Sequence, residues 1–187
     1  MAELTSAERR SIRDCGIIVV DAGPLMSILV LKYAFSREPN AARSIIHNSR
    51  IADYVREDEA MQQAMVRLFN DVRQLTTTSH VIGELQGLQE LTDDHQVEFW
   101  NTAMNWLALK NLDESLIALL DLHGKARSQE WVKEIGPTDA GLLQLTLKKG
   151  AVLLTDDRRT LTATARAAKI DCRLVRDELL YYRPNSA

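Results

Sequence analysis

The sequence predicts an α/β fold, in which helices cover both faces of a mostly parallel sheet of about five short strands in a three-layer α/β/α arrangement. Apolar runs over 17–20 and 151–154 are typical of short strands buried on both faces. Segments with apolar residues at helical spacing separate such runs along the chain. This alternation is the order expected when helical crossovers join parallel strands.

Length and composition fit one soluble globular domain over 1–187, with a core at about 17–175. The 187 residues are 45% hydrophobic and 26% charged, and the formal net charge is −3. A non-specific nucleic-acid binder is usually far more basic, so any nucleic-acid contact must use local cations. Cys15 and Cys172 suggest no disulfide framework, so we expect a reduced, cytoplasmic setting. The polar start of the chain and the lack of a long apolar run predict no signal peptide and no membrane contact.

The first strand runs into Asp21 and is followed by a deeply packed helix. Pro24 suits the first turn of that helix, and 25–35 is apolar almost all round. Pro39 breaks the pattern, and helical spacing then resumes. We therefore expect a helical insertion at about 36–73, after the first helix.

The middle of the chain predicts a second strand and two more helices. Residues 75–79 are rich in β-branched side chains, which favour strands. Ser79 caps a helix that carries Glu84, and Thr92 starts another helix. A very short strand is expected at Leu112.

The remaining segments again alternate between helix and strand. Gly136 and Pro137 stop one helix and start the next, and Gly150 is a standard helix stop. The other predicted elements are a short leading helix after Ser6, helices over 114–131, 140–149 and 158–168, strands over 151–155 and 172–175, and a closing turn capped by Asp177.

Carboxylates stand at the ends of several of these elements. Asp21 ends the first strand, Asp156 and Asp157 end the strand over 151–155, and Asp139 opens the helix that leads to it. Glu84 lies in the first turns of the helix after the second strand. Successive parallel strands end at one edge of the sheet, where ligands of open α/β sheets bind. We therefore expect these side chains to share a pocket.

The negative charge of such an acidic pocket must be offset. Two carboxylates about 4 Å apart repel by ~4 kcal/mol at an effective dielectric of about 20, so protons or a cation must offset the charge. Oxygen ligands suit Mg²⁺ or Mn²⁺, which can position and acidify a water for attack on phosphorus. Taken alone, each aspartate is more often a turn former or helix cap, so the prediction depends on the whole set.

Three segments of the sequence resemble the PIN-domain family of nucleases. They are 18–25, 78–85, and 137–143 followed by 152–158. The resemblance implies that the catalytic and metal-binding acids are Asp21, Glu84, Asp139 and Asp157.

The same resemblance assigns roles to the neighbours of Asp157. Asp156 occupies the variable position of a threonine–any residue–aspartate pattern and would assist at the metal, and the Thr155 hydroxyl would orient the site and contact substrate. Arg158 and Arg159 directly follow the acids and are the candidates for substrate binding. For both arginines, pairing with a site carboxylate is an equally good interpretation.

Similarity to this family implies a Mg²⁺- or Mn²⁺-dependent endoribonuclease that cleaves single-stranded RNA. Many bacterial members are toxins of toxin–antitoxin pairs, so an antitoxin protein is a candidate partner beside the RNA substrate, and we expect a homodimer. Here the acids Asp21 and Glu84 are separated by more chain than in the compact toxins.

Three other interpretations stay open. The chain could be a catalytically silent PIN-like scaffold that binds RNA or a protein, or a DNA-directed nuclease of similar fold. It could also be a phosphatase of another α/β fold with an aspartate nucleophile after the first strand. Such phosphatases usually carry a second acid two positions on, where this chain has Gly23.

Overall fold

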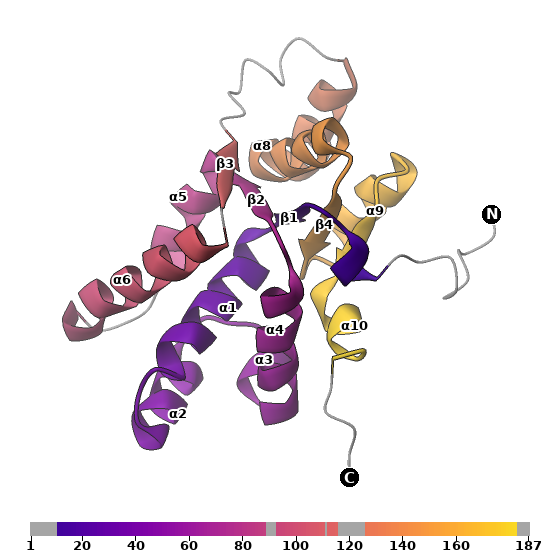
Figure 1. Cartoon of the computed structure of the whole chain (residues 1–187). Helices are drawn as coiled ribbons and strands as arrows, with labels where there is room; N and C mark the ends of the chain where they lie inside the picture. The colour runs from indigo at the N-terminus through magenta and orange to yellow at the C-terminus, as the bar shows by residue number, and fades with distance from the viewer. Residues whose placement is uncertain (1–10, 89–92, 111, 116–125, 183–187) are drawn as a thin grey trace.

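The computed structural model describes residues 11–88, 93–110, 112–115 and 126–182 (Figure 1). Within these residues, β1 (Ile18–Val20), β2 (Leu75–Thr78), β3 (Asp113–Ser115), β4 (Val152–Thr155) and β5 (Cys172–Leu174) form a sheet in the order β3-β2-β1-β4-β5. Every neighbouring pair is parallel. The predicted α/β class with a parallel sheet is confirmed.

The central strand β1 has β2 on one side and β4 on the other. Its three residues are fully buried, and Val20 lies opposite Leu154 of β4. The chain passes from β1 to β2 in one direction and reaches β4 in the other direction, so the strand order reverses at β1. The crevice outside the carboxyl ends at such a reversal is the usual ligand position in open α/β sheets.

Helices flank the sheet on opposite sides. α8 (Ala126–Lys149) contacts β2, β1 and β4, whereas α1 (Ala22–Ala34) lies on the other side (Figure 1). α1 is buried almost all round because α2, α4, α5 and α6 pack against it, as its apolar sequence predicts. α9 (Thr160–Ala167) and α10 (Val175–Leu179) pack against β5, and the short 3-10 turn Ile12–Asp14 contacts α4.

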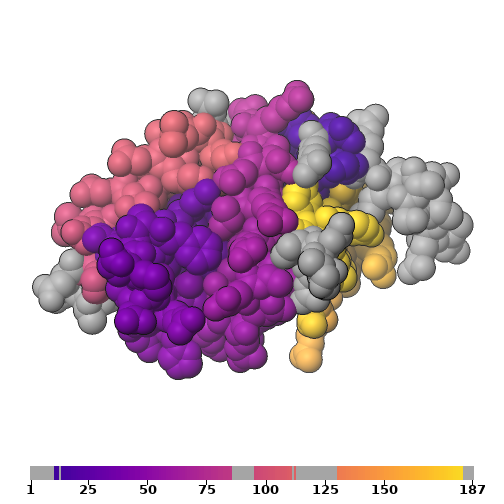
Figure 2. Space-filling model, turned by 60° about the horizontal axis from the view of Figure 1, so that its bottom comes forward, coloured from indigo at the N-terminus to yellow at the C-terminus, as the bar shows by residue number. Residues whose placement is uncertain are grey.

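The predicted insertion at about 36–73 is helical. It contains α2 (Pro39–Asn48), α3 (Asp53–Arg56) and α4 (Glu59–Asp71). Figure 2 shows residues of this segment, in purple, over much of the face turned toward the viewer. α2 and α4 pack against α1, and α4 also contacts α10. The insertion is therefore built into the core.

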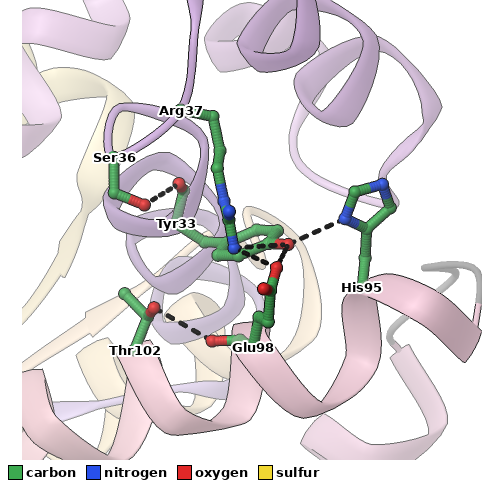
Figure 3. Close-up of polar contacts among 6 residues, drawn as sticks. All are labelled: Tyr33, Ser36, Arg37, His95, Glu98 and Thr102. Carbon is green, nitrogen blue, oxygen red and sulfur yellow. Dashed lines mark hydrogen bonds and ion pairs between the residues drawn. The ribbon is translucent and has the colours of Figure 1, made fainter.

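α5 (Ser79–Leu88) and α6 (Asp93–Leu109) follow β2. Side-chain contacts join α6 to the end of α1 (Figure 3). The Tyr33 ring is fully buried, and its hydroxyl lies 2.9 Å from His95 Nδ1. Arg37 Nη2 donates to that hydroxyl over 3.2 Å and also pairs with Glu98. The Tyr33 ring meets Phe99 edge to face. Polar and aromatic contacts thus join these helices.

One predicted boundary, the start of the helix expected over 114–131, changes in the structure. Glu114 and Ser115, placed in a helix by the sequence, belong to β3, where they pair with Thr77 and Thr78 of β2. Pairing with the neighbouring strand β2 overrides the weak preference of these two residues for a helix. The rest of the predicted 114–131 helix up to residue 125, and the short leading helix after Ser6, lie outside the described residues.

The predicted break at Gly136 and Pro137 is confirmed. Gly136 interrupts α8 with φ 83° and ψ 170°, a conformation that glycine adopts readily, and Pro137 restarts the helix. Gly150, at φ 59°, follows the last residue of α8. The helix that carries Asp139 therefore has a defined start two residues before that side chain.

Among the described helices, none is both long enough and apolar enough to cross a membrane.

Candidate functional site

The carboxyl ends of β1 and β4 bring two of the predicted acids to the same edge. Because these strands are neighbours in parallel register, Asp21 and the acids after β4 leave the sheet side by side. The backbone N–H of Asp21 donates to Leu154 O over 3.0 Å, which continues the ladder to the first acid. Both acids therefore lie at the predicted carboxyl edge, which the structure shows to be where the strand order reverses.

Asp21 is held by two hydrogen bonds. Its Oδ1 accepts from the backbone N–H of Ala22 over 2.6 Å at the start of α1, and its Oδ2 accepts from Thr155 Oγ1 over 2.6 Å. Burial raises the pKa of Asp21, and repulsion from Glu84 and Asp157 raises it further, whereas the two hydrogen bonds act against this shift. The carboxylate is therefore oriented, but its charge is poorly compensated.

Thr155 connects the two strand ends. It is fully buried, donates to Asp21, and accepts from the backbone N–H of Asp157 over 3.0 Å. A hydroxyl can donate and accept at once, so this one side chain sets the positions of both acids.

Asp157 caps the start of α9. Its Oδ1 accepts from the backbone N–H groups of Arg159 and Thr160 over 2.7 and 3.0 Å, and its Oδ2 accepts from that of Leu161 over 3.3 Å. Burial would raise the pKa of Asp157, but these backbone bonds together outweigh burial and lower it below its ordinary value. Asp157 is thus ionised at neutral pH.

Asp139 and Glu84 complete the electrostatic group. Asp139 lies near the restart of α8, and burial together with repulsion from Asp21, Asp157 and Glu84 raises its pKa to about 7. Glu84 is exposed on α5 and also repels Asp21. The structure therefore places Asp21 and Asp139 within electrostatic range of each other, and each of them within range of Asp157 and Glu84.

Asp156 lies beside this group and has a partner that the sequence did not indicate. The Tyr54 hydroxyl, from α3 of the insertion, donates to Asp156 Oδ1 over 2.5 Å. Burial raises the pKa of Asp156 to about 6 and repulsion from Asp21 adds to it, whereas Tyr54 and Arg158 act in the opposite direction. No local pattern could reveal Tyr54, because it stands 102 positions away from Asp156.

The predicted substrate-binding arginines lie at the rim of the acids. Arg158 and Arg159 are both exposed, and Arg158 attracts Asp156 electrostatically. Arg159 contributes its backbone N–H to Asp157 while its side chain is exposed. Both side chains can therefore reach an anionic ligand outside the acids.

In the part of the chain that the structure describes, no three His, Cys, Asp or Glu side chains form a group that could hold a metal ion. Glu84 and Asp157 lie close enough to raise the pKa of Asp21 and of Asp139, and all four acids supply only oxygen ligands. That chemistry fits a hard divalent cation, which would offset the repulsion.

A surface hollow of about 320 Å³ lies elsewhere, between the helices of the insertion. The residues that line it are Arg43, Ile46, His47, Arg56, Glu57, Glu59 and Gln62. None of the predicted site acids is among them. The hollow is therefore separate from the edge of the sheet that carries Asp21, Glu84, Asp139 and Asp157, here called the acidic edge.

No family model matches the sequence, and a search of curated proteins finds no match either.

Proposed function

We propose that the carboxyl edge of β1 and β4 is the divalent-cation site of a PIN-like phosphodiesterase, an endoribonuclease that cleaves single-stranded RNA. One observation carries the proposal. Asp21 and Asp157 meet where the strand order reverses, Thr155 joins them, and both repel Asp139. A repulsive group of oriented carboxylates at this place is suited to binding a hard cation.

Asp21, Glu84, Asp139 and Asp157 would hold Mg²⁺ or Mn²⁺, with Asp156 beside them. When bound, such a cation supplies an acidified water and offsets the charge that develops on a phosphate. The chain itself orients the ligands, since Ala22 and Thr155 fix Asp21 and the start of α9 fixes Asp157.

Asp139 would exchange a proton at the site, and Arg158 and Arg159 would bind the substrate. With a pKa of about 7, Asp139 exchanges its proton near neutral pH in the cation-free protein. Arg158 and Arg159 would contact the phosphates of RNA, which their exposure supports.

The finer parts of the proposal follow the resemblance to PIN-domain nucleases. They are the three-layer α/β/α arrangement with about five strands, the role of toxin, an antitoxin partner, a homodimer and a cytoplasmic location. Helices on opposite sides of the parallel sheet support the first of these.

The test compares wild-type protein with Asp21→Asn in cleavage of single-stranded RNA and single-stranded DNA with Mn²⁺. We expect Asp21→Asn to lose RNA cleavage by about 100-fold or more, as for loss of a metal-site group, while circular dichroism and the melting temperature show a folded protein. Asp177→Asn, an exposed carboxylate on α10, is the matched control and should cleave like wild type.

Different failures separate the alternatives. Equal cleavage by Asp21→Asn and wild type would show that the site is assigned wrongly. Mn²⁺ binding without cleavage of either nucleic acid would favour the silent scaffold, and cleavage of DNA alone would favour the DNA-directed nuclease.

A further inference from the structure

The inserted segment reaches the acidic edge through the side chain of Tyr54. This residue lies in α3, and its hydroxyl bonds to Asp156 Oδ1 over 2.5 Å. A hydroxyl and a carboxylate at this distance form a strong, charge-assisted hydrogen bond. The contact therefore depends on α3 staying folded against the end of β4.

The second oxygen of Asp156 faces α1. A Cβ atom added to Gly23 would lie 3.5 Å from Asp156 Oδ2, so this oxygen lies over the first turn of α1. Gly23 stands two residues after Asp21, which repels Asp156. The Asp156 carboxylate is thus held between α3 and the first turn of α1, beside the first acid of the site.

Opposing forces act on this carboxylate. Repulsion from Asp21 drives it away from the site, whereas the Tyr54 hydroxyl holds it. Arg158 attracts it too, but that side chain is exposed at the rim. Without the hydroxyl, Asp156 would lose the hydrogen bond that opposes the repulsion from Asp21.

We propose that Tyr54 is a positioning residue of the acidic site, which holds Asp156 beside Asp21 and thereby ties α3 to the sheet edge. The effect on cation binding rests on the proposed function, whereas the tie between α3 and Asp156 does not. If Asp156 contributes its charge to a bound cation, then the cation and the folded position of α3 stabilise each other.

A double-mutant cycle of Tyr54→Phe and Asp156→Ala tests the tie without any cation. The readout is hydrogen exchange, by NMR in EDTA, of the amides of Val55, Arg56 and Glu57, which bond to the carbonyls of residues 52 and 53. We expect each single variant to speed this exchange about tenfold, the size of a lost hydrogen bond to a charged group. The double variant should add little to either, because both remove the same contact.

Tyr181→Phe is the matched control, since it removes the same hydroxyl from an exposed residue that follows α10. It should leave exchange in α3 unchanged. Unchanged exchange in Tyr54→Phe, or simple addition of the two single effects, would overturn the tie between α3 and Asp156.

Calorimetry with Mn²⁺ tests the positioning role on the same proteins. We expect Tyr54→Phe to bind Mn²⁺ about tenfold more weakly than wild type, as for loss of a residue that orients a ligand, and Tyr181→Phe to bind like wild type. If wild type binds Mn²⁺ and Tyr54→Phe binds it equally well, the positioning role is overturned while the cation site stands. If wild type binds none, the cation site and the positioning role both fall, and the exchange cycle alone decides the tie to α3.

Discussion

Asp157 serves the fold and the site at once. Its carboxylate accepts backbone N–H groups at the start of α9 and contributes charge to the acidic edge. Because these bonds lower its pKa, its contribution to stability is complete above the ordinary pKa of aspartate. That contribution is lost as the pH falls through the lowered pKa of the folded state.

Replacing Asp157 by Asn or by Ala should separate these roles. Asn keeps one oxygen that can accept from Arg159 and Thr160 and is a good capping residue, so Asp157→Asn should lose little stability at pH 7. Asp157→Ala should lose about 1 kcal/mol or more of unfolding free energy. Both should weaken Mn²⁺ binding alike, because both remove the charge. Urea unfolding and calorimetry measure the two effects, and equal stability of the two variants would contradict the capping role.

The same residues show how far a sequence can predict a site. Asp21 and the pair Asp156 and Asp157 could be predicted because the evidence for them is local, an apolar run that ends in an acid, whereas the choice of Asp157 over Asp156 follows the resemblance to PIN-domain nucleases. Parallel topology then places them at one edge. Tyr54 could not be found, since its contact with Asp156 depends on how the insertion folds over distant chain.

Among the elements, α1 has different tasks at its two ends. Its first turn lies at the acidic edge, where Asp21 caps it. Its last turn contacts α6 through Tyr33 and His95. In a helix, about 1.5 Å of rise per residue puts these ends well apart. Changes to the contact between Tyr33 and α6 should therefore alter the stability of the fold but not cation binding.

Tyr33→Phe tests this separation. The buried ring is kept, but His95 and Arg37 lose the hydroxyl that they contact. We expect the free energy of unfolding to fall by about 1–2 kcal/mol, with Mn²⁺ affinity as in wild type. Chemical unfolding and calorimetry provide the measurements. A change in Mn²⁺ affinity would show that the two ends of α1 are coupled.

The elements also show where pattern reading failed. Strands β1 and β4 could be predicted because their residues are buried and, apart from Thr155, apolar. The helix prediction for Glu114 and Ser115 is wrong because these polar residues pair with Thr77 and Thr78 in the sheet. A strand defined by its neighbour leaves little trace in its own sequence.

At the scale of the whole molecule, the fold brings several acids to one edge of the sheet. The repulsion among them lowers the stability of the folded protein. The pKa of Asp21 is raised, that of Asp139 is raised to about 7, and that of Asp156 is raised to about 6. In the folded state these groups bind protons more tightly than in the unfolded chain. Their ionisation therefore lowers the stability of the protein as the pH rises from about 4 to about 7.

This charge predicts a pH-dependent response to cations. In EDTA the protein should melt at a lower temperature at pH 8 than at pH 5. Mn²⁺ should raise the melting temperature more at pH 8, because at pH 5 protons already offset much of the charge and compete with the cation. A cation at 100 times its Kd adds about 2.7 kcal/mol to the free energy of unfolding.

Asp139→Asn provides the matched variant for this experiment. It removes one repelling charge, so in EDTA it should melt at a higher temperature than wild type at pH 8 and depend less on pH between 5 and 8. It should also gain less from Mn²⁺, because one proposed ligand is gone. Asp177→Asn, which changes an exposed carboxylate on α10, should follow wild type throughout. A melting temperature in EDTA that does not fall from pH 5 to pH 8, and that Asp139→Asn leaves unchanged, would contradict the concentration of charge at this edge.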